Sequence, residues 1–182
     1  MKSIHYICGL PRAGSTLLAN ILAQNPDIHT TPTSGCHDVL FGIKNNWDKL
    51  IEHQASKELA DTANLKRVLA ATLNTYHDTD RPIIIDKGRG WTSMLEMLEW
   101  VTDEKAEGRT SQQLLNSSVL GLAFDRLKDA MHRGYGDRLH FVEFDDLTHN
   151  PKKKMEEVYS FLGLAPFAHN FQSVEQYTHE DD

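Results

Sequence analysis

Residues 9–18 read Gly9-Leu10-Pro11-Arg12-Ala13-Gly14-Ser15-Thr16-Leu17-Leu18, and they directly follow the apolar run Ile4-His5-Tyr6-Ile7-Cys8. The apolar run predicts a buried strand, and apolar residues at helical spacing from Leu17 to Leu22 predict a helix that begins near Ser15. A helix start presents unpaired backbone N–H groups and a positive dipole end, which together attract an anion. Gly9 and Gly14 let the backbone bend and approach that anion closely. The two hydroxyls that follow, of Ser15 and Thr16, add donors. The stretch therefore predicts a phosphate-binding loop.

The spacing of this loop differs from that of nucleotide hydrolases. Their loop requires G-x-x-x-x-G-K-[ST], in which the Lys reaches the β- and γ-phosphates and the hydroxyl binds magnesium. Here Ser15 stands at the Lys position, and the nearest cation is Arg12 inside the loop. Because a hydrolase without that Lys loses its main charge clamp, ordinary nucleoside triphosphate hydrolysis is not expected.

Length and composition set the broad class of the protein. A chain of 182 residues with 40% hydrophobic and 25% charged residues suits one globular domain spanning 1–182. The formal net charge of −7 argues against a general nucleic-acid binder. Neither the two cysteines, Cys8 and Cys36, nor the ten histidines have metal-ligand spacing, so no metal site is predicted. Without a signal peptide or a membrane span in the sequence, we expect a cytoplasmic protein that does not bind membranes.

A second strand carries the next cations. Residues 81–86 predict a buried strand, because Ile83, Ile84 and Ile85 form a continuous β-branched run of the kind found in parallel sheets. The segment Lys87-Gly88-Arg89-Gly90-Trp91 follows at once. In open α/β sheets ligands bind beyond the carboxyl ends of strands. We therefore expect Lys87 and Arg89 at the same edge of the sheet as Arg12 and Gly14. The predicted fold is a three-layer α/β P-loop-like domain with a mainly parallel sheet flanked by helices.

The remaining elements are predicted from periodicity, capping residues and breakers. The predicted helices and strands lie at residues 28–31, 36–52, 65–76, 91–101, 111–132, 138–144 and 151–162. Between Val101 and Ser111 the sequence is charged and carries no strand signal.

The loop Pro11–Leu18 resembles the 5′-phosphosulfate loop of the sulfotransferases. The segments 82–100 and 138–164 resemble later parts of that family, in the family's order. The resemblance implies a P-loop fold and the sulfuryl donor 3′-phosphoadenosine 5′-phosphosulfate. It also implies that Lys87, at a strand end, contacts the transferring sulfuryl group. The residues expected to bind the donor are Pro11, Arg12, Ala13, Gly14, Ser15, Thr16 and Arg89.

The catalytic base is less clearly marked. Sulfuryl transfer needs a deprotonated acceptor, commonly through His or Glu. Soluble sulfotransferases carry a His two places after the strand-end Lys, where this chain has Arg89. The tyrosine-directed branch has a Glu after the first helix, where this chain has Thr33 nearby. The remaining candidates are His37 and Asp38, which could also simply begin a helix, and Asp86 is a weaker one.

One family motif is not found. Sulfotransferases carry a further strand after the helix that here ends near Val101, with an Arg and a later Ser that hold the donor's 3′-phosphate. No residue of this chain can be assigned to that motif, so either the protein lacks it or an internal segment is missing from this sequence. The apolar helix running directly into a charged linker favours a missing segment. We then expect a chain break between about Trp100 and Ser111, together with a vacancy of one strand in the sheet or a strand that has no number in this sequence.

Two other functions stay open from the sequence. A small-molecule kinase could use the same loop, although the missing Lys after Gly14 and the lack of a clear magnesium-holding Asp speak against it. A nucleotide-binding module without turnover would be consistent with the missing motif. The acceptor, a hydroxyl or an amine, is not identified by the sequence.

Overall fold

A parallel five-stranded sheet forms the centre of the molecule. The computed structural model describes residues 2–9, 12–31, 33–56, 58, 60–102, 110–113 and 121–176. The strands lie in the order β2-β3-β1-β4-β5, and every neighbouring pair is parallel. Their bounds are β1 Ser3–Gly9, β2 Ile28–Thr31, β3 Ile83–Lys87, β4 Thr110–Gln113 and β5 Leu139–Phe141. The predicted α/β fold with a parallel sheet is therefore confirmed.

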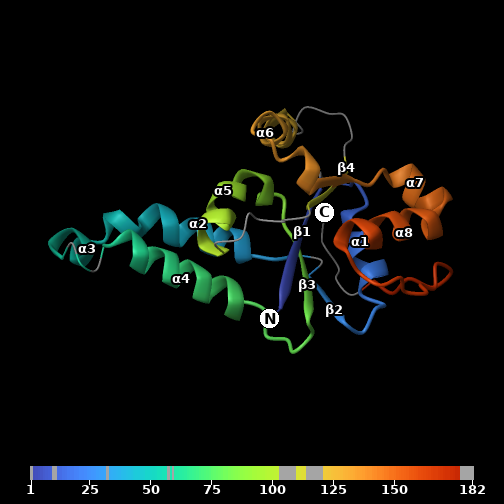
Figure 1. The fold of residues 1–182 in the computed structure, drawn as a ribbon, viewed down its shortest axis with the longest axis horizontal. Helices are drawn as coiled ribbons and strands as arrows, with labels where there is room; N and C mark the ends of the chain where they lie inside the picture. The colour runs from blue at the N-terminus through green and yellow to red at the C-terminus, as the bar shows by residue number, and fades with distance from the viewer. Residues whose placement is uncertain are drawn as a thin grey trace.

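Helices cover both faces of this sheet (Figure 1). On one face lie α1 Ser15–Leu22, α7 Phe144–His149 and α8 Pro151–Leu162. On the other lie α2 Cys36–Asn46, α4 Thr62–Thr75 and α5 Leu95–Thr102. The chain also forms α3 Ile51–Ala55, α6 Gly121–His132 and the 3₁₀ turns η1 Trp47–Lys49, η2 Trp91–Ser93 and η4 Gly136–Arg138. The two helical layers and the sheet make up the predicted three layers.

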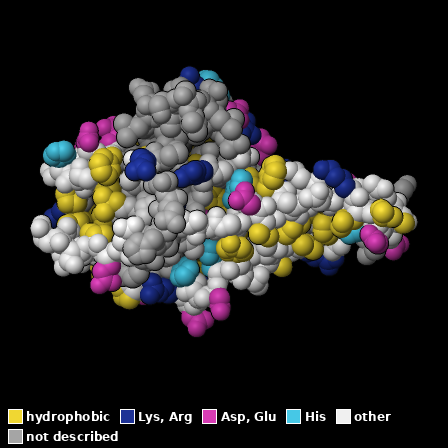
Figure 2. Space-filling model, turned by 180° about the vertical axis from the view of Figure 1, so that it is seen from behind, with side chains coloured by type: hydrophobic (Ala, Val, Ile, Leu, Met, Phe, Trp, Pro, Cys, Tyr) yellow, Lys and Arg dark blue, Asp and Glu magenta, His cyan; other side chains and the backbone are white. Residues whose placement is uncertain are grey.

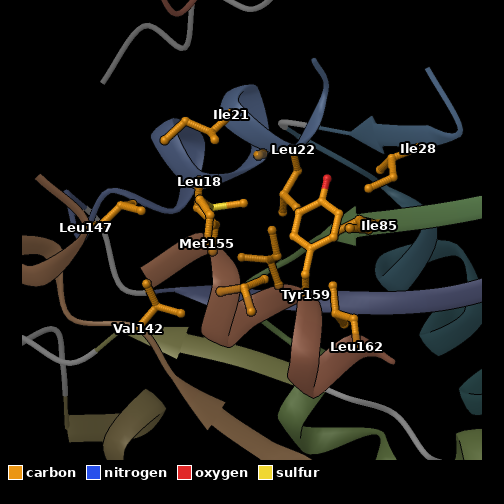
Figure 3. Close-up of a cluster of buried hydrophobic side chains, with 13 residues drawn as sticks. Leu18, Ile21, Leu22, Ile28, Ile85, Val142, Leu147, Met155, Tyr159 and Leu162 are labelled. Atoms are coloured by element: carbon orange, nitrogen blue, oxygen red, sulfur yellow. The ribbon is translucent and has the colours of Figure 1, made fainter. Parts of the chain in front are cut away.

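The face under α1 and α8 holds one hydrophobic core (Figure 3). Leu18 and Leu22 of α1 meet Met155 and Tyr159 of α8 over Ile85 of β3. All five side chains are buried. Burial of this apolar surface fixes α1 against the sheet, and α1 begins where the predicted phosphate loop ends.

The opposite face packs around Trp91. Its indole is fully buried and lies 4.3 Å, between ring centroids, from Tyr6 of β1. The same cluster includes Cys36 and Leu40 of α2, together with residues of α4 and α5. Beyond it, α2, α3 and α4 extend away from the sheet as an arm, and hydrophobic side chains run along its surface (Figure 2).

Several boundaries differ from the sequence prediction. The helix expected over 36–52 is broken into α2, η1 and α3. The expected strand 138–144 ends at Phe141, and Phe144 already begins α7. Helix α8 begins at Pro151 and ends before Gly163 in the left-handed conformation, as predicted, but Asn150 makes no side-chain capping hydrogen bond. No helix in the described ranges is long and apolar enough to cross a membrane.

The segment around Ser111 corrects two predictions. The single helix expected from about Ser111 to His132 is wrong at its start, because residues 110–113 form β4; within the described residues, α6 spans Gly121–His132. The expected strand-wide vacancy is also wrong, since β4 lies between β1 and β5 and pairs with both. The expected chain break between about Trp100 and Ser111 falls on residues 103–109, which lie outside the described ranges.

Candidate functional site

The predicted phosphate loop joins the central strand β1 to helix α1. Gly14 precedes the helix with φ 76°, a left-handed conformation that favours glycine. The first backbone bond of the helix runs from Leu18 N to Gly14 O at 3.0 Å. The N–H groups of Ser15, Thr16 and Leu17 therefore belong to the first turn, which has no acceptors within its own helix. This is the geometry that an anion requires.

Close packing holds the loop against the end of its strand. A Cβ at Gly9 would lie 2.7 Å from Ser15 Cβ, so the end of β1 and the start of α1 can approach this closely only with glycine there. Ala13 is fully buried, whereas Arg12 is exposed and has a positive φ of 60°. Pro11, also predicted to bind the donor, lies outside the described residues.

Lys87 brings a cation to this loop. It is the last residue of β3 and lies opposite Ile7 of β1 in the parallel register. Its ammonium Nζ donates a hydrogen bond of 2.8 Å to Thr16 Oγ1, and the residue is only 8% exposed. A largely buried positive charge at a helix start strengthens the attraction for an anion, because the local dielectric is low. The structure thus brings together Lys87 and Thr16, which the sequence placed only at one edge of the sheet.

Arg89 follows in the loop after β3. Its side chain is exposed, and its carbonyl accepts a hydrogen bond of 3.2 Å from the Cys8 thiol of β1. Arg12 follows the carboxyl end of β1, and Arg89 follows that of its parallel neighbour β3; both side chains are exposed. Both can meet a polyanionic ligand that enters from solvent.

Of the two base candidates, His37 lies beside the Lys87–Trp91 loop. A Cβ built at Gly90 would lie 2.1 Å from His37 Nε2, so the imidazole sits directly on the glycine backbone. The ring also stands edge-on to Trp91, with centroids 5.6 Å apart. The His37 side chain is 16% exposed, whereas that of Asp38 is 84% exposed, and the two approach at 3.2 Å between Nδ1 and Oδ1. Of the two side chains, His37 is the more buried and packs against this loop; the identity of the base stays a prediction.

The weaker base candidate, Asp86, is fully buried and already engaged. Its Oδ1 accepts a hydrogen bond of 2.9 Å from Trp91 Nε1, and its Oδ2 accepts one of 2.7 Å from Ser34 Oγ. His77 Nε2 lies 2.9 Å from Oδ2, but its orientation does not make a hydrogen bond. Sequence reasoning missed the roles of Ser34, His77 and Trp91. The available signal was a carboxylate at the end of an otherwise apolar strand, which needs buried partners.

Three side chains of this cluster are of metal-ligating types. The ligating atoms of Cys36, His77 and Asp86 all lie within 4.8 Å of one another, and the three residues are buried. Burial and the nearby Asp86 carboxylate raise the pKa of the Cys36 thiol to about 12, so the thiol is protonated at neutral pH. Since both Asp86 oxygens also accept hydrogen bonds, we interpret the cluster as a polar network. The absence of a metal stays a prediction.

Comparisons with known proteins agree on one family. A model described as the sulfotransferase family matches residues 6–88, and one described as the sulfotransferase domain matches residues 90–180. Among solved structures, the sulfotransferase domain from the curacin biosynthetic pathway resembles this chain with a TM-score of 0.52 and 15% identity. The match covers 99% of this chain and 79% of that one. No curated protein sequence matches.

Proposed function

This chain belongs to the sulfotransferase family, and we propose that it transfers a sulfuryl group from 3′-phosphoadenosine 5′-phosphosulfate to a hydroxyl or amine acceptor. The observation that carries the donor assignment is the hydrogen bond between Lys87 Nζ and Thr16 Oγ1 at 2.8 Å. It places a nearly buried cation at the start of a helix whose first-turn backbone N–H groups have no acceptors within the helix itself.

The loop would hold the donor through its 5′-phosphosulfate. The N–H groups from Gly14 to Thr16 would bind its oxygens, and Arg12 would add a positive charge from the solvent side. Arg89 would provide a second exposed cation. Such contacts fix the sulfur at one place and orientation, which is how a site without covalent chemistry accelerates transfer.

In the reaction the acceptor atom forms a bond to sulfur while the bond between sulfur and the bridging oxygen breaks. Negative charge then builds on that oxygen, which leaves with 3′-phosphoadenosine 5′-phosphate. Lys87 would neutralise this charge, and its low exposure makes the interaction stronger than it would be in water. The acceptor proton must leave at the same time.

His37 is the proposed acceptor of that proton. Its imidazole lies beside the loop that carries Lys87, and Asp38 is directed to solvent. We expect His37→Gln to slow turnover by about 10²-fold, which is typical for loss of a general base. Steady-state rates of the variant and the wild type measure this effect.

Asp38→Asn is the matched control for this base. It removes the neighbouring carboxylate and leaves the imidazole in place, so the rate should change little. A loss as large in Asp38→Asn as in His37→Gln would move the base from His37 to Asp38.

Binding and turnover together test the proposed function. Calorimetric titration should detect binding of 3′-phosphoadenosine 5′-phosphate and much weaker binding of ATP·Mg²⁺, because Ser15 replaces the Lys of triphosphate-binding loops. Sulfate transfer to a panel of hydroxyl and amine acceptors should follow. Preferred binding of ATP·Mg²⁺ would favour a kinase, and binding of the bisphosphate without transfer to any acceptor would favour a module without turnover.

A further inference from the structure

The carboxylate of Asp86 lies at the end of β3, directly before Lys87, and is fully buried. Burying such a group costs free energy unless its oxygens are satisfied. Here Trp91 Nε1 and Ser34 Oγ each donate one hydrogen bond, at 2.9 and 2.7 Å. These donors belong to segments before α2 and after β3, so the carboxylate joins parts of the chain that are distant in sequence.

The bond to Trp91 closes the loop that carries Lys87 and Arg89. Trp91 is five residues after Asp86, and its indole turns back over Gly88 to reach the carboxylate. A Cβ at Gly88 would lie 2.7 Å from Trp91 Nε1, so this closed shape requires glycine at that position. The loop is also tied to β1, through a hydrogen bond of 2.9 Å from Gly88 N to Ile7 O.

Asp86 and Lys87 serve opposite faces of the sheet. Successive residues of a strand point to opposite sides, so fixing one side chain fixes the direction of the next. Asp86 meets Trp91 in the layer with α2, α4 and α5. Lys87 reaches Thr16 of α1 in the other layer. The contacts of Asp86 thus hold the backbone from which the Lys87 side chain extends.

We propose that Asp86 is a positioning residue, which acts through its bonds to Trp91 and Ser34 to hold Lys87 on Thr16. Its effect on sulfuryl transfer rests on the proposed function, whereas its effect on Lys87 is a property of the free protein. The conformation of the Lys87 side chain can therefore be tested without a donor or an acceptor.

Trp91→Phe removes the indole donor and keeps an aromatic ring in the core. The matched control is Trp47→Phe, because the Trp47 indole N–H is also buried but makes no hydrogen bond within the described part of the chain. Competitive acetylation of the free protein with acetic anhydride, read by peptide mass spectrometry, reports how accessible each lysine amine is. Exposed Lys153 serves as the internal reference.

We expect acetylation of Lys87, relative to Lys153, to rise about tenfold in Trp91→Phe, since a lost bond to a buried charge shifts local opening by that order. It should stay at the wild-type level in Trp47→Phe. An unchanged Lys87 in a folded Trp91→Phe would overturn the proposal. If Trp91→Phe does not fold, Ser34→Ala serves as the second variant, because it removes the other donor to Asp86. A rise in Lys87 acetylation in Ser34→Ala would then support the proposal, and an unchanged level would overturn it.

Turnover then separates positioning from general destabilisation. In a double-mutant cycle, Lys87→Ala should cost much less rate in the Trp91→Phe background than in the wild type, because Lys87 is already displaced. Additive losses would overturn the link between Asp86 and Lys87 in catalysis. Failure of the wild type to bind 3′-phosphoadenosine 5′-phosphate would instead contradict the proposed function, and the acetylation result on Lys87 would still stand.

Discussion

A Gly14→Val variant will lose binding of 3′-phosphoadenosine 5′-phosphate while keeping most of its fold. Two costs act at this position. The φ of 76° at Gly14 is one that a β-branched residue rarely adopts, and the added side chain would stand where an anion must approach the backbone of α1. Calorimetric titration should show affinity reduced by roughly 10²-fold or more, a loss comparable to that of a buried charged hydrogen bond or two.

Gly134→Val provides a matched control for backbone strain. Gly134 has a similar φ of 86°, and nothing lies within 4 Å of a Cβ built there. Both variants should therefore lose comparable stability in thermal unfolding, but only Gly14→Val should lose the ligand. Equal loss of binding in the two would mean that strain, and not access of the anion to the loop, explains the effect.

Strong local patterns predicted most of the fold. The β-branched run before Asp86 and the apolar residues after Gly14 gave β3 and α1 at nearly their observed positions. Such segments can be recognised in a sequence, because burial of one or both of their faces requires a regular pattern of apolar residues. The sheet edge that carries Lys87 followed from the rule on strand ends.

β4 could not be predicted in the same way. Its residues Thr110–Gln113 are all polar, and none gives the apolar pattern on which a strand prediction depends. The segment becomes a strand through pairing with β1 and β5 on its two sides. Strand propensity depends strongly on such neighbours, which a single sequence does not contain.

The buried contacts of the candidate site were the least predictable. The bond from Ser34 to Asp86 joins residues 52 positions apart, and His77 reaches the same carboxylate from the end of α4. Sequence spacing carries no information on such pairs, because only packing of the layers brings them together. The carboxylate itself was visible in the sequence, but its donors were not.

Lys87→Ala should reduce turnover by roughly 10²-fold or more, as for the loss of a preorganised charge at a reacting oxygen. The affinity for 3′-phosphoadenosine 5′-phosphate should fall much less, because the backbone groups of the loop still bind the phosphate. This difference follows from where charge develops, since the bridging oxygen gains its negative charge only as the sulfuryl group leaves. Steady-state kinetics and calorimetry on the same preparation measure the two effects.

Lys154→Ala is the matched control for removing a lysine. The Lys154 side chain is only 12% exposed, so this lysine is largely buried, as Lys87 is. It pairs instead with two carboxylates, Glu157 of α8 at 2.7 Å and Asp146 of α7 at 3.0 Å. Its loss should leave turnover unchanged. If Lys87→Ala lowered affinity and turnover by the same factor, Lys87 would bind ground state and transition state equally and would act as an ordinary anion clamp. A larger effect on turnover than on affinity is expected only for a cation whose main partner is the charge formed during transfer.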